Sequence, residues 1–264
     1  MLMMVACDIP AARKTSGFTS HNSTCTCYKC NKHFPHLEND VNVDFRGFDF
    51  SRWVLRDGVE NRLHAEKWES ASTPSERHRL EVKNGVRWSQ LHCLEYLDLV
   101  RGMIINPMHN LFLGTPKRLM DCWIKDKDIQ DGDFAAIQKT AETMIVPGGY
   151  TSLNSKIGKQ FLYMKADESK SWMLVYLSVL LKDALAKNRF ENWINFVDAC
   201  CLLIKPTITF DEVNTAYQFL QTFCTRCDEL YNAEILTCNM HLHLHLRDTI
   251  HDFGPVYAYW LFGF

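Results

Sequence analysis

Apolar residues recur at helical spacing through the second half of this chain, and this pattern limits the fold more than any other feature. The stripes cover residues 173–184, 190–204, 213–227 and 239–262. Spacing of this kind places the apolar side chains on one face of a helix, which must pack against another apolar face. Pro206 ends the second stripe, Thr209-x-x-Glu212 is a capping box before the third, and Gly254-Pro255 interrupts the fourth. We therefore predict a mainly α-helical fold.

The first half carries helix signals of its own. Thr73, Pro74 and Glu76 form an N-terminal capping pattern, and Asn84-Gly85 is a typical helix end. We predict one helix between them and a further helix over residues 89–105. Asn106-Pro107 then predicts the start of another helix. Its expected apolar face consists of Met108, Leu111, Phe112, Leu119 and Trp123.

Two sites that contain proline and glycine interrupt the segments predicted to be helical. Pro116 predicts a kink near Gly114 in the helix that follows Asn106. Pro147-Gly148-Gly149 predicts a loop and a sub-domain boundary.

Composition sets the class of protein. The chain has 264 residues, of which 47% are hydrophobic and 23% charged, enough for one large domain or two small ones. A net charge of -2 predicts no overall attraction to nucleic acid, so any such surface would be local. No apolar run reaches the roughly 18 residues that a membrane span needs, so we expect no membrane partner.

The cysteines indicate a reducing compartment. Eleven cysteines are scattered along the chain, and its first six residues lack the basic and apolar regions of a signal peptide. We therefore expect an intracellular protein that is not secreted, with thiols that are free or bound to metal.

A cysteine- and histidine-rich region follows over residues 21–66. Cys27-x-x-Cys30 has the spacing with which two thiolates bind one tetrahedral zinc ion. Two more ligands are needed for a closed site, and the candidates are His21, Cys25, His33, His36 and His64. The alternative is a loop with reduced surface cysteines.

Histidines also crowd the start of the last stripe, at His241, His243, His245 and His251. On a helix His241 and His245 share a face, which is the spacing that lets two imidazoles chelate a metal. No glutamate follows His241, so this is not the HExxH pattern of metalloproteases. We favour the simpler interpretation, a helix whose histidines form hydrogen bonds with their neighbours.

Residues 9–37 contain basic residues and no aspartate or glutamate. The basic residues are Arg13, Lys14, Lys29 and Lys32. With Phe18 and Tyr28 among them, they could contact the phosphates of DNA, or they could lie on an ordinary solvated loop. The chain has no glycine-rich phosphate loop, no GxSxG elbow and no dinucleotide fingerprint, so we expect no small-molecule substrate.

The residues at the N-terminus have two possible interpretations, a turn or part of a catalytic site. Residues 2–7 form an apolar run that predicts a buried strand, and Asp8-Ile9-Pro10 follows directly. An aspartate at the end of such a strand is either part of a turn or a ligand in a metal-dependent phosphoryl-transfer site.

Several longer motifs resemble the catalytic domain of CACTA (En/Spm)-like DDE transposases, in particular the fungal Plavaka type. The matching text comprises Cys7-Asp8-Ile9-Pro10-Ala11-Ala12-Arg13-Lys14, Gly17-Phe18, Cys27-x-x-Cys30, Gly85-Val86-Arg87, Asn106-Pro107-Met108-His109-Asn110-Leu111-Phe112-Leu113-Gly114-Thr115, Asn239-Met240-His241-Leu242-His243, Asp252-Phe253-Gly254-Pro255 and Trp260-Leu261-Phe262. The motifs follow the family order over nearly the whole chain.

This resemblance implies an RNase H-like enzyme of the nucleus. Such enzymes hold two Mg²⁺ or Mn²⁺ ions on three carboxylates and cut and join DNA. Asp8 would be the second carboxylate, and Asn106 and His109 would occupy the family's D-x-x-H motif. Cys27 and Cys30, with His64 as partner, would bind structural Zn²⁺.

The resemblance also divides the chain. It implies a core-strand remnant bearing Asp8 over residues 1–20 and a zinc-binding region over 21–66. A helical insertion with the NPMHN motif would follow over 67–147, and a helical bundle segment over 148–264.

Departures from the family pattern predict an inactive fragment. The family's first aspartate lies upstream of the strand at residue 2, and its last glutamate follows text that here ends at Phe264. Asn106 stands where the family has an aspartate. If the aspartate acts through its charge, asparagine has lost that role, whereas it can still cap the helix that follows. We expect a degenerate transposase fragment. The alternatives are a non-catalytic module that binds transposon-end DNA or a full-length transposase, and a domesticated zinc-stabilised interaction protein.

Overall fold

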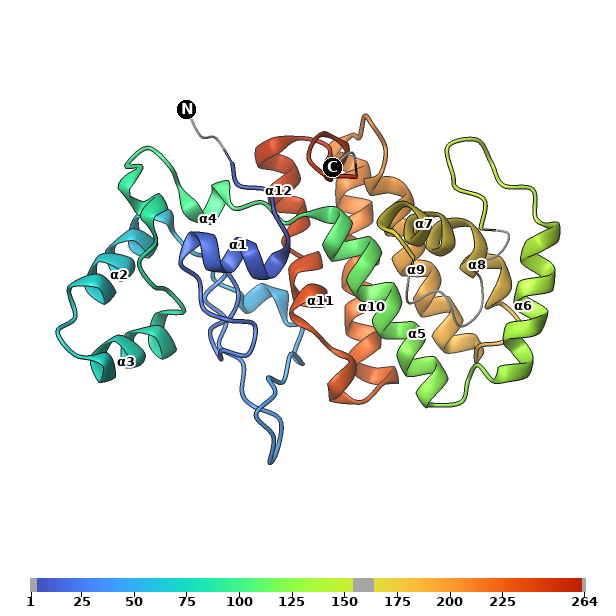
Figure 1. Ribbon diagram of the computed structural model, residues 1–264, viewed down its shortest axis with the longest axis horizontal. Coiled ribbons are helices and arrows are strands. Elements are labelled where there is room, and N and C mark those ends of the chain that lie inside the picture. Colours follow the sequence, from blue (N-terminus) through green and yellow to red (C-terminus); the bar gives the residue numbers. More distant parts are fainter. Residues whose placement is uncertain (1–3, 154–163, 263–264) are drawn as a thin grey trace. The chain divides into compact units, whose positions relative to one another are not determined.

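The chain folds into two compact units, each built mostly of helices (Figure 1). The computed structural model describes residues 4–153 and 164–262. Unit 1 comprises Met1–Asn106 and Leu236–Phe253, and unit 2 comprises Pro107–Ile235 and Gly254–Phe264. The prediction of a mainly α-helical protein is confirmed. The described residues form isolated β-bridges and no sheet, so the RNase H-like core stays a prediction.

These units do not coincide with the four regions expected from the sequence. The unit boundary falls between Asn106 and Pro107, inside the expected helical insertion. Residues from the expected C-terminal bundle, Leu236–Phe253, belong to the same unit as the cysteine-rich region.

Unit 1 contains short helices joined by long irregular segments. They are α1 (Ile9–Ser16), η1 (Phe50–Arg52), α2 (Gly58–Ser70), α3 (Pro74–Asn84), η2 (Gln90–Cys93), α4 (Leu99–Gly102), α11 (Cys238–His243) and α12 (Leu246–Phe253). The predicted helix after Thr73 is α3, capped by the Thr73 hydroxyl and ended by Gly85 in the left-handed conformation. The single helix expected over residues 89–105 is wrong, because η2 and α4 are separate short helices there.

The N-terminal segment is not a buried strand in its described part. Val5 forms one parallel bridge with Met103, and residues 4–7 are exposed or half-buried. Residues 2 and 3 of the expected strand lie outside the described range. A strand needs further bridges on at least one side, and Val5 has a single partner here. Asp8 is exposed and serves as the N-cap of α1, where its Oδ1 accepts a hydrogen bond from the Ala11 amide at 2.6 Å.

Two buried arginines support the irregular loop that carries the cysteines. Arg13 donates to the Thr26 carbonyl, and Arg56 donates to the carbonyls of Cys27 at 2.7 Å and Asn84 at 2.8 Å. Gly85 lies against the same loop, and a Cβ at Gly85 would come within 2.2 Å of the Cys25 carbonyl oxygen. This close approach and its φ of +69° make glycine the suitable residue at the end of α3.

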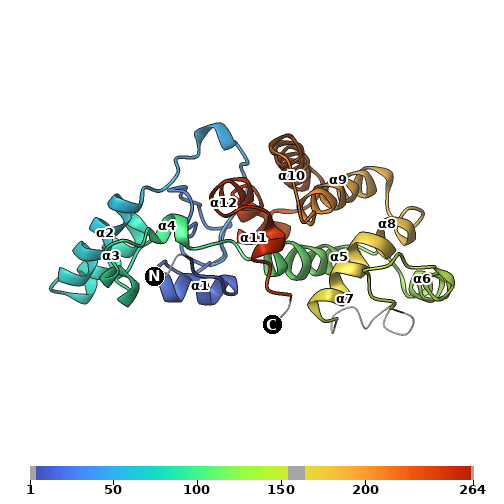
Figure 2. The same cartoon turned by 90° about the horizontal axis from the view of Figure 1, so that it is seen from above.

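Unit 2 contains the two longest described helices, α9 and α10, together with shorter helices, around an aromatic core. They are η3 (Met108–Gly114), α5 (Thr115–Lys125), α6 (Asp131–Thr143), α7 (Ala166–Ser171), η5 (Trp172–Tyr176), α8 (Leu177–Leu180), α9 (Lys187–Leu203), α10 (Phe210–Leu230), η6 (Ala233–Ile235) and η7 (Val256–Ala258). Helices α9 and α10 lie side by side as a hairpin (Figure 2). Trp123 and Trp193 meet edge to face with centroids 5.6 Å apart, and Phe196 packs on Phe223 at 4.7 Å.

The helix predicted after Asn106 forms with an unusual first part. Met108–Gly114 is a π-helix that passes directly into the α-helix α5, so the helix type changes at the point where the sequence predicts a kink. Leu111, Phe112, Leu119 and Trp123 are buried as expected. The Ser169 hydroxyl of α7 donates to the Phe112 carbonyl at 2.6 Å, which ties α7 to this π-helix.

The four stripes of the second half lie mostly on helical segments. The second and third are α9 and α10. The first is divided between η5 and α8 and ends in a turn over residues 181–184, and the fourth is divided among α11, α12 and η7. Among the described helices, none combines the length and the apolar character that a membrane crossing requires.

Candidate metal centre

The Cys27–Cys30 loop has the local geometry of a metal-binding turn. Both side chains are fully buried. The Cys27 sulfur accepts hydrogen bonds from the amides of Lys29 at 3.2 Å and Cys30 at 3.3 Å. Such amide donors stabilise a thiolate, which is the form of cysteine that binds metal.

Two histidines approach this loop from the C-terminal part of unit 1. His241 is in α11 and His245 follows one turn later, before α12. The Thr237 hydroxyl caps α11 by accepting a hydrogen bond from the Met240 amide. His241 is fully buried and His245 is 3% exposed. The spacing of four residues places both imidazoles on the same side of the chain.

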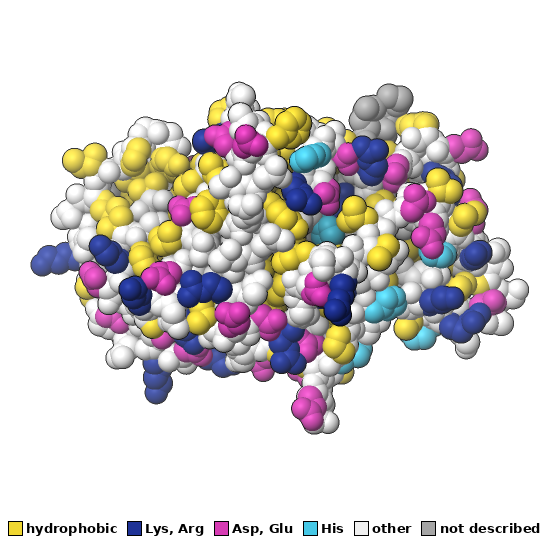
Figure 3. Space-filling model, turned by 180° about the vertical axis from the view of Figure 1, so that it is seen from behind, with side chains coloured by type: hydrophobic (Ala, Val, Ile, Leu, Met, Phe, Trp, Pro, Cys, Tyr) yellow, Lys and Arg dark blue, Asp and Glu magenta, His cyan; other side chains and the backbone are white. Residues whose placement is uncertain are grey.

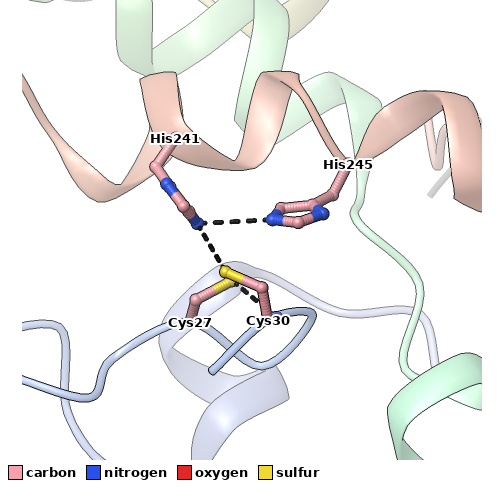
Figure 4. A group of neighbouring side chains, drawn as sticks. All are labelled: Cys27, Cys30, His241 and His245. Atoms are coloured by element: carbon pink, nitrogen blue, oxygen red, sulfur yellow. Dashed lines mark hydrogen bonds between the residues drawn. The ribbon is translucent and has the colours of Figure 1, made fainter. Parts of the chain in front are cut away.

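The four side chains converge on one point (Figure 4). Their potential ligand atoms all lie within 4.8 Å of one another, and among the described residues this is the group that could hold a metal ion. The two Nε2 atoms of His241 and His245 are 3.3 Å apart, and Cys30 Sγ lies 3.3 Å from His241 Nε2. A tetrahedral zinc ion with bonds of about 2.0 Å to nitrogen and 2.3 Å to sulfur has edges of roughly 3.3–3.8 Å. The donor set and its spacing therefore fit a closed zinc site.

Electrostatic interactions among the four side chains favour one thiolate. Burial raises the pKa of Cys27, but the hydrogen bond from Cys30 and the nearby His241 and His245 outweigh it and lower the pKa well below the usual value. The hydrogen bond to Cys27 and burial raise the pKa of Cys30. Burial lowers the pKa of His241 to about 4. Burial also acts to lower the pKa of His245, but the Cys27 thiolate and Asp248 raise it to about 9.

Aromatic rings and one carboxylate surround the group. Trp53 lies over His241 with centroids 4.1 Å apart and planes tilted by 33°, and Phe34 meets His241 edge-on at 5.0 Å. Asp248 Oδ2 is 3.7 Å from His245 Nδ1, an arrangement with which a carboxylate orients a metal-bound imidazole. His241 Nδ1 is buried without a hydrogen-bond partner among the described residues. The ring stacking therefore fixes the orientation of His241.

The other histidine and cysteine candidates lie elsewhere. His64 is on α2, with its Nε2 3.8 Å from a Glu60 carboxylate oxygen, so the expected third ligand does not join the group. Cys25 is buried, and its sulfur accepts a hydrogen bond from Arg56 at 3.1 Å. His21 and His33 are exposed.

Two further histidine positions are also outside the group. His36 is exposed, and its Nδ1 lies 3.1 Å from the Val41 carbonyl oxygen. His243 is buried and is not one of the four grouped side chains, and burial lowers its pKa to about 3.

Sequence reasoning found the spacing of His241 and His245 but preferred a packing role for them. The structure brings both to the cysteines, although His241 lies 211 residues after Cys30. The sequence signal for the complete site was an incomplete cysteine motif together with an incomplete histidine motif. Each supplies two ligands where a closed site needs four.

The basic residues proposed for DNA contact do not form one exposed patch. Arg13 is 3% exposed and Lys29 is 7% exposed, and burial lowers the pKa of Lys29 to about 8. Lys14 is exposed, whereas the Lys32 ammonium lies 4.9 Å from the Trp53 ring centroid. On the face shown in Figure 3, positive and negative side chains are intermixed. Arg13 and Lys29 are therefore buried, and the contact with DNA phosphates expected of the four residues stays a prediction.

The remaining predicted residues stand apart from the metal centre. Asp8 caps α1 and is not in the group of potential metal ligands. Asn106 is 1% exposed, and His109, in the π-helix, is half-buried.

Comparisons with known proteins give no family or relative. No family model, no curated protein and no solved structure matches this chain.

Proposed function

We propose that this chain is a zinc-stabilised, non-catalytic part of a CACTA-like DNA transposase. The buried group of Cys27, Cys30, His241 and His245 carries the zinc part of the proposal. Zinc in a closed tetrahedral site of this kind contributes folding free energy and leaves no position for a substrate. The role of the metal is therefore structural, since it joins the N-terminal cysteine loop to the segment of α11 and α12.

The resemblance supplies the transposase part of the proposal. Two blocks of text that carry it, Cys27-x-x-Cys30 and Asn239-Met240-His241-Leu242-His243, meet at the metal centre. This supports the interpretation that the motifs that match the family belong to one folded unit. In that setting the chain acts in the nucleus and contacts transposon-end DNA or an intact transposase.

Metal analysis of the purified chain tests the zinc site. We expect about one zinc ion per chain. We also expect Cys27→Ser and His241→Ala to lose the metal and to unfold at lower temperature. His64→Gln and Cys93→Ser are the matched controls, because His64 lies outside the group and the Cys93 thiol is exposed. A zinc-free native chain with a Cys27→Ser variant of unchanged thermal stability would rule out the site.

A DNA assay tests the non-catalytic role. The zinc-loaded chain is incubated with double-stranded DNA and Mg²⁺ or Mn²⁺, and cleavage is followed on a gel. We expect no cleavage. Metal-dependent cleavage that Asp8→Ala abolishes would overturn this part of the proposal and leave the zinc site untouched.

A further inference from the structure

A cavity of about 300 Å³ lies in unit 1 next to the metal centre. Its lining includes two buried cationic side chains, Lys29 and Arg56, which are each 7% exposed. Leu55, Arg101 and Asp252 are exposed and form part of its rim. Lys29 stands between the ligands Cys27 and Cys30 in the sequence, so the cavity and the metal share one loop.

Each of the two carboxylates that line the cavity has a partner of its own. Asp252 accepts two hydrogen bonds from the Arg101 guanidinium, one of them from Nε at 3.1 Å. Asp248 Oδ2 lies 3.7 Å from Nδ1 of the metal-ligand candidate His245. Neither carboxylate pairs with Lys29 or Arg56 among the ion pairs of the described residues.

Lys29 and Arg56 instead donate to groups without a formal charge. The Lys29 ammonium donates to the carbonyls of Val100 at 2.7 Å and Arg101 at 3.3 Å. Arg56 donates to two carbonyls, and its Nη2 is 3.1 Å from the Cys25 sulfur. An ammonium has three donors and a guanidinium five, so these bonds leave donors for another acceptor. Cys27, Asp252, Asp248 and Asp98 act on Lys29 as nearby negative charges, and none of the ion pairs of the described residues includes Lys29. An anion in the cavity would offset the remaining cost of burying Lys29 and Arg56 beside it.

We propose that this cavity binds an oxyanion of the phosphate class. Ammonium and guanidinium groups form strong charge-assisted hydrogen bonds with phosphate oxygens. Either a free phosphate or the phosphodiester group of a nucleic acid offers this chemistry. The inference goes beyond the metal site and does not require the transposase proposal.

Replacing Leu55 tests the proposal by charge alone. Leu55 is 55% exposed at the rim, so neither Leu55→Glu nor Leu55→Gln removes a packed core residue. Equilibrium dialysis with inorganic phosphate, against chloride at constant ionic strength, measures binding to the zinc-loaded chain. We expect saturable binding that Leu55→Glu weakens at least about tenfold, because it adds a negative charge at the rim. We expect Leu55→Gln to stay within about twofold of the native chain.

A second variant addresses the buried wall. Lys29→Met removes the ammonium but keeps the amide that donates to Cys27. We expect at least about a tenfold loss of phosphate affinity in samples that keep their zinc, while Arg79→Gln on α3, an exposed control, binds as the native chain does. No saturable binding by the zinc-loaded native chain, or equal binding by Leu55→Glu and Leu55→Gln, would overturn the proposal.

Competition identifies the source of the phosphate group. A short single-stranded DNA that displaces phosphate assigns the cavity to a phosphodiester, and one that does not displace it assigns the cavity to a small phosphoanion. Zinc content is measured on the same samples. A chain that binds phosphate without containing zinc would refute the metal site and leave the anion site standing.

Discussion

Trp53 packs against both histidines of the metal centre. Its ring lies 4.1 Å from the His241 ring centroid and 5.6 Å from that of His245. Lys32 lies over the same indole, with its ammonium 4.9 Å from the centroid. Apolar and aromatic groups around a metal site limit the access of water and chelators to the ligands.

Trp53→Ala should therefore loosen the metal while leaving all four ligands in place. We expect zinc to pass to a competing chelator several-fold faster. We also expect the free energy of unfolding to fall by about 2 kcal/mol, roughly half of the cost of truncating a fully buried tryptophan. Stopped-flow chelator competition and denaturant unfolding measure the two effects. Trp68→Ala, on α2, is the control, since Trp68 is also half-buried but its ring packs on Arg77. Equal release rates from both variants would show that Trp53 does not shield the metal.

At the scale of helices, local signals in the sequence were reliable. The capping box at Thr209 and Glu212 forms as predicted at the start of α10, where the Glu212 amide donates to the Thr209 hydroxyl at 3.3 Å. Thr73 and Gly85 delimit α3 for the same reason. Caps and stops depend on contacts within one turn of the chain, so they can be predicted without the rest of the fold.

Signals that depend on distant partners were weaker. The third and fourth metal ligands are brought to the cysteines by a contact between residues 211 positions apart in the sequence. The spacing of neighbouring residues cannot predict such a contact. Residues 89–105 have enough apolar residues for one helix, yet Asp98 caps a separate short helix by accepting bonds from the amides of Val100 and Arg101. Arg13 and Lys29 lie in a segment whose composition is typical of a basic surface patch. Their side chains are nevertheless buried and donate hydrogen bonds to carbonyl oxygens elsewhere in unit 1.

The start of α10 predicts a response to acid. Lys205, with its Nζ 2.6 Å from Oε1, and the bonds from Thr209 lower the pKa of Glu212 to about 2. A folded pKa below the ordinary glutamate value of about 4.3 means that this pairing stabilises the helix above that value. The contribution is lost as the pH falls through about 2. We expect Glu212→Gln to be less stable than the native chain at pH 6 and nearly equal to it at pH 2, as measured by urea unfolding. Glu229→Gln, near the end of α10, is the comparison. A difference at Glu212 that is the same at both pH values would contradict this account.

At the scale of the whole chain, all four metal-ligand candidates belong to unit 1. Unit 2 has a core of its own, with Trp193, Phe196 and Phe223 buried between α9 and α10. The metal should therefore stabilise the two units unequally.

Chelation tests this difference through hydrogen exchange. Removing zinc should raise amide exchange several-fold in the cysteine loop and in α11 and α12, because the bond between these two segments is lost. Exchange in α9 and α10 should stay within about twofold of the zinc-loaded state, since neither helix supplies a ligand. Mass spectrometry of peptides from each segment gives both rates. A uniform increase over the whole chain would show that the metal supports both units.

Zinc K-edge X-ray absorption of the zinc-loaded chain measures the donor set of the metal centre. We expect a first shell of two sulfur atoms at about 2.3 Å and two nitrogen atoms at about 2.0 Å. A shell of oxygen and nitrogen alone, or one with three or four sulfur atoms, would contradict the site formed by Cys27, Cys30, His241 and His245.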